Sequence, residues 1–235
     1  MAAARLSLRT APYSERKWPT EGKVILGQTT TQFRSDEPEA IVVYQAYHPR
    51  IGRHAAQHKR FSDAPGWLDG RMTWFKTNFL WMMYRSDWAR SKNQECILAI
   101  WLRWSDFCAI AMEACPTSYQ PERFPTREAW QAAMSSSEVR LQWDPDHAPS
   151  GAKHPTRRAI QIGVKNETQR RWASGEMFLD VQDITPFVTE QRENVGAARS
   201  EHLQVVDETE INIRALRPDV AAHLAVTCPS DAPSA

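Results

Sequence analysis

The hydrophobic and polar positions along the chain follow two different periods, which predicts strands and helices in alternation. Residues 41–47, 97–102 and 158–164 are short runs rich in β-branched, aromatic and leucine side chains, the composition of strands buried in a sheet. Residues 139–143 and 177–181 predict two further strands, and residues 211–213 a last edge strand. We therefore expect an α+β domain in which helices flank a central sheet that is mixed or mostly antiparallel.

Capping residues and prolines mark where helices are expected to begin. The predicted helices, given by first residue and approximate end, are Pro49 to 60, Thr77 or Asn78 to 90, Ser105 to 115, Thr126 to 134 and Pro218 to 224. Residues 183–187 predict a turn into one more short helix. In the second of these helices, the 3.6-residue period places four side chains on one stripe: Trp81, Tyr84, Arg85 and Trp88.

Polar segments flank the expected domain at both ends. A chain of 235 residues, of which 42% are hydrophobic, is suited to one globular domain. We expect that domain at residues 38–226, after a polar N-terminal extension at residues 1–37 that is partly disordered. The Pro-, Ser- and Ala-rich residues 227–235 predict a disordered tail.

Charge and hydropathy narrow the class of partner. Lys and Arg number 29 and Asp and Glu 28, so the net charge of +1 argues against an extended nucleic-acid partner while leaving a local basic patch open. No run of about 18 apolar residues is present, so we expect no membrane span. The N-terminus has no apolar run of signal-peptide length, and we expect a soluble, cytoplasmic protein.

The motifs of several common sites are absent. The nine glycines form no dinucleotide-binding or Walker loop, and the chain has no Cys-x-x-Cys pair and no nucleophile elbow. Cys108 and Cys115 are expected to pack on one helical face. His54 and His58 have the spacing of two metal ligands on one helical turn, with His147 as the candidate third ligand. Because an isolated pair is weak evidence, no metal site is expected.

Two glutamines lie where a buried strand would favour apolar side chains. Gln45 shares the apolar face of its predicted strand, so its amide needs hydrogen-bond partners from the backbone or from a ligand. Gln161 lies between Ala159 and Gly163 on one face of its strand. These small residues leave room above the sheet, which either a packed helix or a bound ligand could fill.

Three cations, Arg71, Lys76 and Arg85, lie in a stretch that is rich in Trp, Phe and Met. The only acids between residues 64 and 94 are Asp69 and Asp87, although a buried cation needs an anionic partner. An anionic ligand would supply that partner. In the alternative interpretation, the cations extend to solvent or pack on the aromatic rings, which simply form the core.

The same segments carry a family resemblance. In consistent order over residues 38–190, the chain contains VYQAY, RMTWFKTNFLWMMYRSDWA, LQWDPDH, RAIQIGV and DITPFV. This pattern resembles the family catalogued as domain of unknown function 4291, although the family pattern has Pro-Ser where this chain has Thr77 and Asn78. The resemblance implies a soluble domain of this size with the same order of elements, and it supplies no agreed reaction.

The order of elements is also similar to the split sheet of ADP-ribosyltransferase-like enzymes. In that fold, NAD or another nucleotide lies in a cleft between two half-sheets, although this chain lacks the customary histidine, tyrosine and glutamate signature. On this interpretation Gln161 and Asp144 are the catalytic candidates. The candidates for binding the cofactor are Tyr44, Gln45, Arg71, Lys76, Tyr84 and Arg85.

Two other functions fit the sequence. Arginines beside exposed tryptophans suit a nucleotide-binding or nucleic-acid-binding module without catalysis. An aromatic pocket with converging cations also suits a tailoring enzyme of small-molecule metabolism. In each case the expected ligand is small and anionic or nucleotide-like, with NAD as one possible cofactor. The oligomeric state is left open.

Overall fold

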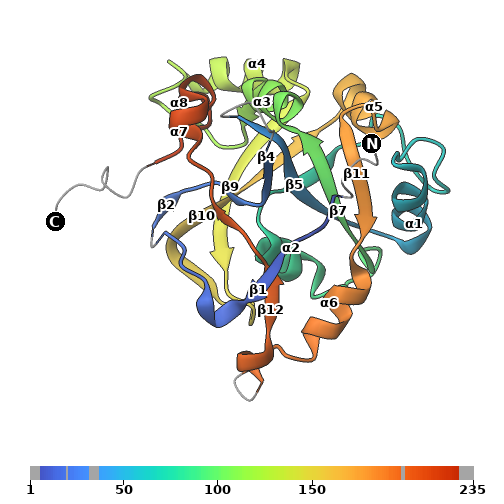
Figure 1. Cartoon of the computed structure of the whole chain (residues 1–235). Helices are drawn as coiled ribbons and strands as arrows, with labels where there is room; N and C mark the ends of the chain where they lie inside the picture. Colours follow the sequence, from blue (N-terminus) through green and yellow to red (C-terminus); the bar gives the residue numbers. More distant parts are fainter. Residues whose placement is uncertain (1–5, 20, 32–36, 197–198, 228–235) are drawn as a thin grey trace.

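A mixed sheet with helices on both faces forms the centre of the protein (Figure 1). The computed structural model describes residues 6–19, 21–31, 37–196 and 199–227. Within this part, the sheet has nine strands. Their order is β11 (Phe178–Asp183), β7 (Cys96–Arg103), β5 (Pro38–Tyr47), β6 (Thr73–Lys76), β10 (Lys153–Val164), β9 (Val139–His147) and β8 (Ala114–Pro116), with β2 (Gly22–Lys23) beside β10 and β4 (Thr29–Thr31) beside β5.

Most strand pairs in this sheet are antiparallel. Parallel pairing joins β2 to β10 and β8 to β9, whereas the other pairs along the sheet run antiparallel. Two small antiparallel pairs lie outside it: β1 (Thr10–Pro12) with β12 (Gln204–Val206), and β3 (Leu26–Gly27) with β13 (Thr209–Glu210). The α+β class and the mixed, mostly antiparallel sheet predicted from the sequence are confirmed.

Seven of the eight α-helices in the described residues form two layers. The α-helices are α1 (Pro49–His58), α2 (Phe79–Ser86), α3 (Trp104–Met112), α4 (Arg127–Ser136), α5 (Asn166–Ser174), α6 (Thr185–Arg192), α7 (Ile213–Leu216) and α8 (Pro218–Leu224). Short 3-10 turns are η1 (Tyr13–Glu15) and η2 (Ser200–His202). Side chains of α1, α3, α5, α7 and α8 pack on one face of the sheet, and those of α2 and α6 on the other.

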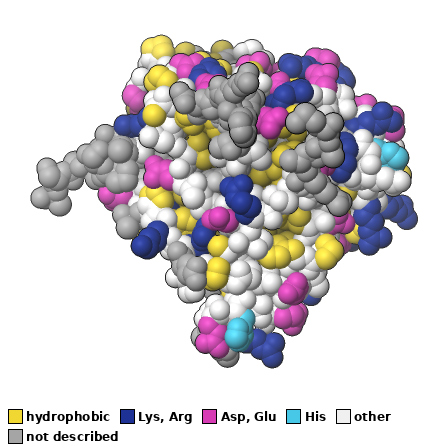
Figure 2. Space-filling view, viewed as in Figure 1, with side chains coloured by type: hydrophobic (Ala, Val, Ile, Leu, Met, Phe, Trp, Pro, Cys, Tyr) yellow, Lys and Arg dark blue, Asp and Glu magenta, His cyan; other side chains and the backbone are white. Residues whose placement is uncertain are grey.

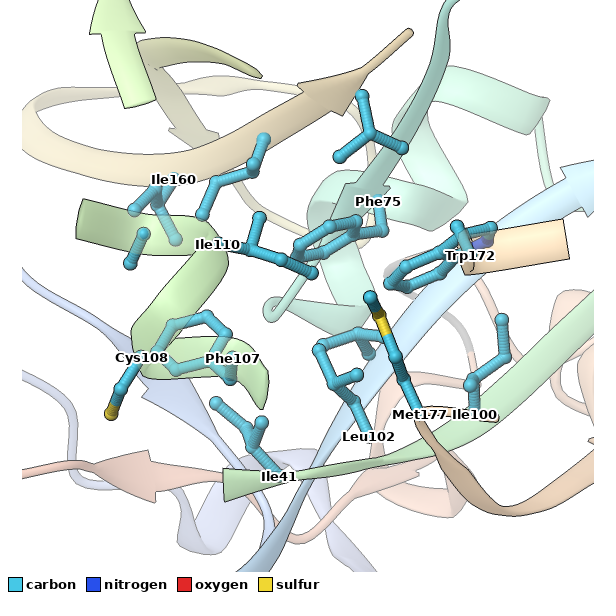
Figure 3. Close-up of a cluster of buried hydrophobic side chains, with 14 of the residues drawn as sticks. Ile41, Phe75, Ile100, Leu102, Phe107, Cys108, Ile110, Ile160, Trp172 and Met177 are labelled. Carbon is cyan, nitrogen blue, oxygen red and sulfur yellow. The ribbon is translucent and has the colours of Figure 1, made fainter. Parts of the chain in front are cut away.

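The alternation of side chains along the central strands produces the two layers. In β5, Ile41 and Val43 face one core, whereas Val42 and Tyr44 face the other. The first core is shown in Figure 3, where Trp172 of α5 lies against Phe75 of β6 with ring centroids 4.6 Å apart. Burial of apolar surface on both faces explains why these strands are hydrophobic throughout.

The sheet separates between β5 and β6. Strand β5 pairs with β7 at every position from Ala40 to Tyr47, but it pairs with β6 only where Tyr44 lies opposite Lys76. Beyond that point the side chain of Gln45 bridges the two strands, since its Nε2 donates hydrogen bonds to Thr73 Oγ1 (3.0 Å) and to the carbonyl of Trp74 (3.1 Å). The sheet therefore consists of two halves that meet at one residue pair.

Several predicted element boundaries are confirmed. Helices α1, α4 and α8 begin at or next to the capping residues or prolines expected for them, and α8 also ends where predicted, at Leu224. The helix predicted after Thr77 or Asn78 starts at Phe79, with Asn78 Oδ1 accepting from the Trp81 amide at 2.7 Å. The start predicted at Ser105 is wrong, because α3 begins at Trp104 with Arg103 at its N-cap and no side-chain cap, so Ser105 lies inside the first turn. Capping residues and prolines therefore locate four of the five helix starts predicted from them.

Other boundaries were wrong, each for a physical reason. Helix α3 stops at Met112 because the chain turns into β8, which pairs with β9; Cys115 is therefore in a strand and does not share a helical face with Cys108. Residues 211–213 do not form an edge strand, since Asn212 caps α7 and Ile213 begins it. The strand in this region, β13, ends at Glu210, directly before the predicted range.

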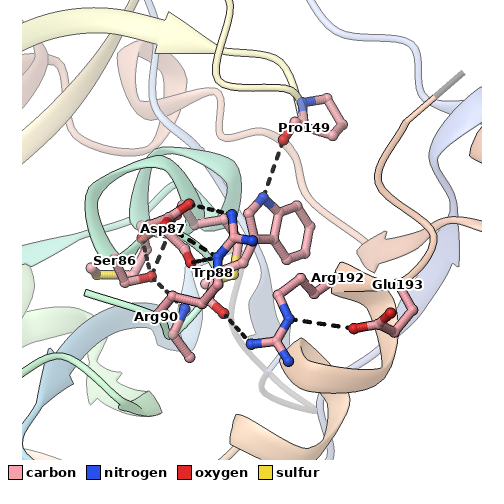
Figure 4. A network of polar contacts seen from close by, with 10 residues as sticks. Ser86, Asp87, Trp88, Arg90, Pro149, Arg192 and Glu193 are labelled. Carbon is pink, nitrogen blue, oxygen red and sulfur yellow. Dashed lines mark hydrogen bonds and ion pairs between the residues drawn. The ribbon is translucent and has the colours of Figure 1, made fainter. Parts of the chain in front are cut away.

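Helix α2 is also shorter than predicted. It ends at Ser86 because Asp87, Trp88 and Ala89 adopt left-handed backbone angles, with φ of 49°, 50° and 66°. The expected stripe on this helix is therefore wrong: Trp88 lies beyond it and is buried, while Tyr84 and Arg85 are exposed. Figure 4 shows how the turn is fixed, with Trp88 Nε1 donating to the Pro149 carbonyl at 3.1 Å.

Parts of the predicted flanking segments cannot be compared with the structure. Residues 1–5, 32–36 and 228–235, the last including almost all of the expected tail, lie outside the described residues. Residues 24–26, within the expected N-terminal extension, are buried. Among the described residues, none of the helices has the length and apolar character needed to cross a bilayer.

Candidate functional site

A cavity of about 800 Å³ lies where β5 and β6 separate; we call it the cleft. Strand β5 contributes Ala46 and Tyr47 to its lining, β6 contributes Trp74 and Lys76, and the loop after α1 contributes residues 65–68. Its other walls come from α2, the turn after α2, and strands β9 and β10 on the far side of β6. The divergence of the two half-sheets therefore creates the space, and segments distant in sequence close around it.

Five cationic side chains line the cleft, and none of its lining residues is acidic. The five are Arg50, Arg71, Lys76, Arg85 and Lys92. No ion pair joins any of them to another residue in the described ranges of the chain. Since like charges repel each other at short range, this arrangement favours the binding of a negatively charged group.

Lys76 is the buried member of this group. Its side chain is 4% exposed, and Nζ lies 5.0 Å from the centroid of the Trp81 ring. Nζ has no hydrogen-bond partner among the described residues. Burial above all, and the nearby Arg85 after it, lower the pKa of the amine from 10.5 to about 7, while Asp144 acts in the opposite direction. The amine is therefore partly neutral at physiological pH.

A row of polar residues crosses the sheet beside Lys76. Strand register places Lys76 opposite Gln161, and Gln161 opposite Gln142. Both amide groups donate to the carboxylate of Asp144, with Gln161 Nε2 at 2.6 Å and Gln142 Nε2 at 2.9 Å. Asp144 does not itself line the cleft, so it acts there through these amides and through its charge. The two amide oxygens accept no hydrogen bond from the described part of the chain.

Trp74 occupies the room that the sequence predicts above the strand of Gln161. A Cβ atom added to Gly163 would lie 2.9 Å from atoms of the Trp74 ring, closer than side chains can approach. Glycine is thus required there by the close approach of the indole, and neither a helix nor a ligand fills that space. Trp74 and Trp67 both line the cleft and give it flat aromatic surfaces.

Helix α2 and the turn after it hold one wall of the cleft. Met82 and Arg85 of α2 line the cavity together with Lys92 and the two residues that follow it. The Gln94 amide, in its hydrogen-bonded orientation, accepts from Arg85 NH1 at 2.9 Å. Contacts shown in Figure 4 anchor the turn, including an ion pair of 2.7 Å between Arg90 and Asp87. Hydrogen bonds and ion pairs within the turn therefore fix the segment that places Arg85 at the cleft.

Four of the eight predicted site residues line the cleft, namely Arg71, Lys76, Arg85 and Gln161. Asp144 lies directly behind Gln161. The structure places the remaining three elsewhere: Tyr44, Gln45 and Tyr84. Sequence reasoning missed Arg50, Lys92 and Trp67, because exposed or half-buried residues from separate segments carry no local signal that they converge.

The three residues outside the cleft make specific contacts of their own. Tyr44 is fully buried against Phe79, with ring centroids 5.7 Å apart. Both polar groups of the Gln45 amide are engaged within the protein. Its Oε1 accepts a hydrogen bond from Trp172 Nε1 at 3.1 Å, and its Nε2 donates hydrogen bonds to Thr73 and Trp74 of β6. Tyr84 is exposed and stacks on His147 at 3.6 Å. None of the three lines the cleft.

One family model covers most of the chain. Described as Domain of unknown function (DUF4291), it matches residues 32–211. The chain belongs to this family. The DUF4291 match includes every residue that lines the cleft, so the cleft is a feature of the family's own region rather than of a flanking segment. No curated protein and no solved structure matches the chain.

Metal-ligating side chains do not gather in the described residues of this DUF4291 domain. No group of three or more His, Cys, Asp or Glu side chains there could hold a metal ion. His54 and His58 lie against each other, with ring centroids 4.4 Å apart, whereas His147 contacts Tyr84 and Trp81. The candidate third ligand is therefore engaged by another part of the structure.

Proposed function

We propose that this DUF4291 domain binds a small anionic, nucleotide-like ligand in the cleft between its half-sheets. The observation that carries the proposal is the acid-free lining with five cations that form no ion pair within the described residues. The cavity of about 800 Å³ has the size of a small-molecule site. A negatively charged ligand would relieve the repulsion among the cations and supply their missing partner.

The chemistry of the lining favours a phosphate ester with an aromatic part. Arg71 and Arg85 carry guanidinium groups, which bind phosphate with two parallel hydrogen bonds. Trp67 and Trp74 offer ring faces for stacking on a base. The net charge of +1 and the mixture of positive and negative side chains on the face seen in Figure 2 favour a short ligand over a polymer.

A specific observation also favours the narrower proposal of an NAD-dependent transferase. The cleft lies where two half-sheets separate, as in the ADP-ribosyltransferase-like fold that the order of elements resembles. The residues fit such a cofactor, since the cations could hold its diphosphate and the tryptophans its rings. Gln161, held by Asp144, would orient the acceptor. We keep a cytoplasmic location as part of the proposal, because the three described cysteines are free thiols.

Binding is tested by thermal unfolding with NAD, ADP-ribose, ATP, inorganic diphosphate and a single-stranded oligonucleotide. A ligand at one hundred times its Kd stabilises the folded state by about 2.7 kcal/mol. Stabilisation by NAD and ADP-ribose supports the proposal of a transferase. Stabilisation by several mononucleotides supports a binding module without catalysis. Selective stabilisation by the oligonucleotide would mean that the cleft binds a polymer rather than a small ligand. No stabilisation by any compound would contradict the proposal and favour a tailoring enzyme with a different substrate.

Variants identify where the ligand binds. Arg71→Ala and Lys76→Ala should abolish the stabilisation by the ligand while the free protein stays folded. Arg170→Ala is the matched control, because this exposed cation of α5 lies outside the cleft. If Lys76→Ala alone fails to fold, Lys76→Met replaces it. This variant keeps an apolar side chain of similar length and removes only the amine, so it tests whether the charge is needed for ligand binding. Unchanged ligand response in both cleft variants would place the site elsewhere.

A further inference from the structure

The cations of the cleft differ in their surroundings. Arg50, Arg71, Arg85 and Lys92 are exposed, whereas Lys76 is 4% exposed and lies at the floor of the cavity. Its amine contacts the Trp81 ring and has no acceptor among the described residues. A buried amine that faces an open cavity without an anionic partner is poorly solvated as a cation. The attraction of an anion does not explain why this one amine is buried, because the exposed cations of the cleft supply positive charge without burial.

We propose that Lys76 is a reactive amine that forms an imine with the carbonyl group of a small anionic aldehyde or ketone. The inference rests on the proposed anion-binding cleft, but it concerns the reactivity of one nitrogen rather than affinity. Lysine becomes nucleophilic when it is desolvated or lies beside another cation, and Lys76 meets both conditions.

The charged groups around the amine set its protonation. Burial and Arg85 lower the pKa of Lys76, and Asp144 raises it, with a net value of about 7. A lysine with its ordinary pKa of about 10.4 is less than about 0.1% neutral at pH 7. Lys76 is therefore the lysine of the cleft that carries a free lone pair in a large share of molecules, and Lys92 is not buried in this way.

The step balances without any further reactant. The lone pair of Lys76 Nζ attacks the carbonyl carbon and forms a C–N bond, while the carbonyl π pair moves to oxygen. Both amine hydrogens then leave with that oxygen as water, and a C=N bond remains. The amide oxygen of Gln161, opposite Lys76 in the strand register, can accept a hydrogen bond from the intermediate hydroxyl. Arg71 and Arg85 would hold the carboxylate or phosphate of the carbonyl compound.

Reductive trapping tests the proposal directly. The protein is incubated at pH 7 with glyoxylate, an anionic aldehyde, and sodium cyanoborohydride, which converts an imine into a stable secondary amine. Peptide mass spectrometry measures the labelling rate at Lys76, at Lys92 in the same cleft, and at the exposed Lys153 outside it. Glycolaldehyde, a neutral aldehyde of similar size, separates reactivity of the amine from attraction of the anion.

We expect Lys76 to be labelled at least about tenfold faster than Lys92 and Lys153, with a pH profile that is half-maximal near 7. Labelling no faster than at Lys153 overturns the proposal, because the amine is then not activated. Fast labelling of Lys76 by both aldehydes at equal rates retains the reactive amine and contradicts the anion-binding cleft. The two proposals therefore fail in different ways. Lys76→Arg, which keeps the positive charge, should remove the labelled peptide.

Discussion

At the scale of single residues, Gln45 shows how one buried amide joins two strands that have stopped pairing. Its three hydrogen bonds reach Thr73, Trp74 and Trp172, which belong to β6 and α5. The sequence predicts correctly that this glutamine needs partners, since it lies on an apolar strand face. It does not predict that the partners are protein groups, because they are distant in sequence.

We expect Gln45→Leu to lower the free energy of unfolding by about 2–4 kcal/mol. The substitution leaves the buried Trp172 indole N–H and the Trp74 carbonyl without their partner, and each such loss costs about 1–3 kcal/mol. Urea denaturation measures the change. Gln57→Leu is the control, because Gln57 is exposed on α1 and its replacement should alter stability by less than about 0.5 kcal/mol. Equal effects of the two variants would contradict the bridging role.

Glu208 is a second buried polar residue whose protonation matters. Burial holds the pKa of its carboxyl well above the ordinary value, and its Oε1 accepts from the Phe79 amide at 2.7 Å. When the pKa of an acid is higher in the folded state than in the unfolded state, its contribution to stability is complete at pH values below the unfolded-state pKa. That stability is lost as the pH rises towards the folded pKa.

Glu208→Gln should therefore become more stable relative to the wild type as the pH rises above about 4.5. Each unit by which burial raises the pKa of Glu208 corresponds to about 1.4 kcal/mol in the difference between the unfolding free energies of the variant and the wild type. Denaturant unfolding at a series of pH values measures it. The exposed Glu210→Gln serves as the control and should follow the wild type. A difference that shrinks with rising pH would show that Glu208 is ionised in the folded protein.

At the scale of elements, the packing of β6 on β10 depends on one residue without a side chain. Gly163→Ala should cost about 1–3 kcal/mol, since the added methyl group overlaps the Trp74 ring. In a Trp74→Ala background the same substitution should cost much less. A double-mutant cycle in urea measures the coupling. Additive effects would mean that the methyl group meets some other obstacle.

The elements differ in how far the sequence predicts them. Helices α1, α4 and α8 begin where capping residues or prolines stand, because a cap is a local signal. Strand β6 and helix α5 were not predicted. Thr73–Lys76 is short, and its Lys76 faces a cavity that only the folded sheet creates. In α5 the buried residues, which include Trp172, alternate with a charged exposed face whose pattern is weak over so few turns.

At the scale of the whole molecule, the distribution of charge carries information that the total charge does not. The net charge of +1 argued against extended polyanions, yet five cations of the chain meet in one cleft. The sequence indicated three of them, Arg71, Lys76 and Arg85, since they are close together and acids are sparse around them. Arg50 and Lys92 could not be found in this way, because only the split of the sheet brings helix α1 and the turn after α2 to the same cavity.

This concentration of like charge predicts how the free protein responds to salt. Raising the ionic strength from about 0.01 M to about 0.1 M shortens the Debye length from about 30 Å to about 10 Å and screens the repulsion across the cleft. We expect NaCl to stabilise the ligand-free wild type by about 0.5–1 kcal/mol more than it stabilises the double variant Arg71→Gln/Arg85→Gln. Urea denaturation at each salt concentration measures the difference.

The control for the salt experiment removes two cations that do have partners. Arg170→Gln/Arg171→Gln breaks exposed ion pairs of α5 with Glu167 and Glu176. Salt weakens such pairs in the wild type, so this variant should gain slightly more from NaCl than the wild type, the opposite sign to the cleft variant. General effects of salt on hydrophobic burial are common to all three proteins and cancel in the comparison. If both double variants shift in the same direction, the cleft cations are too well solvated to repel one another, and the electrostatic basis for an anionic ligand is removed.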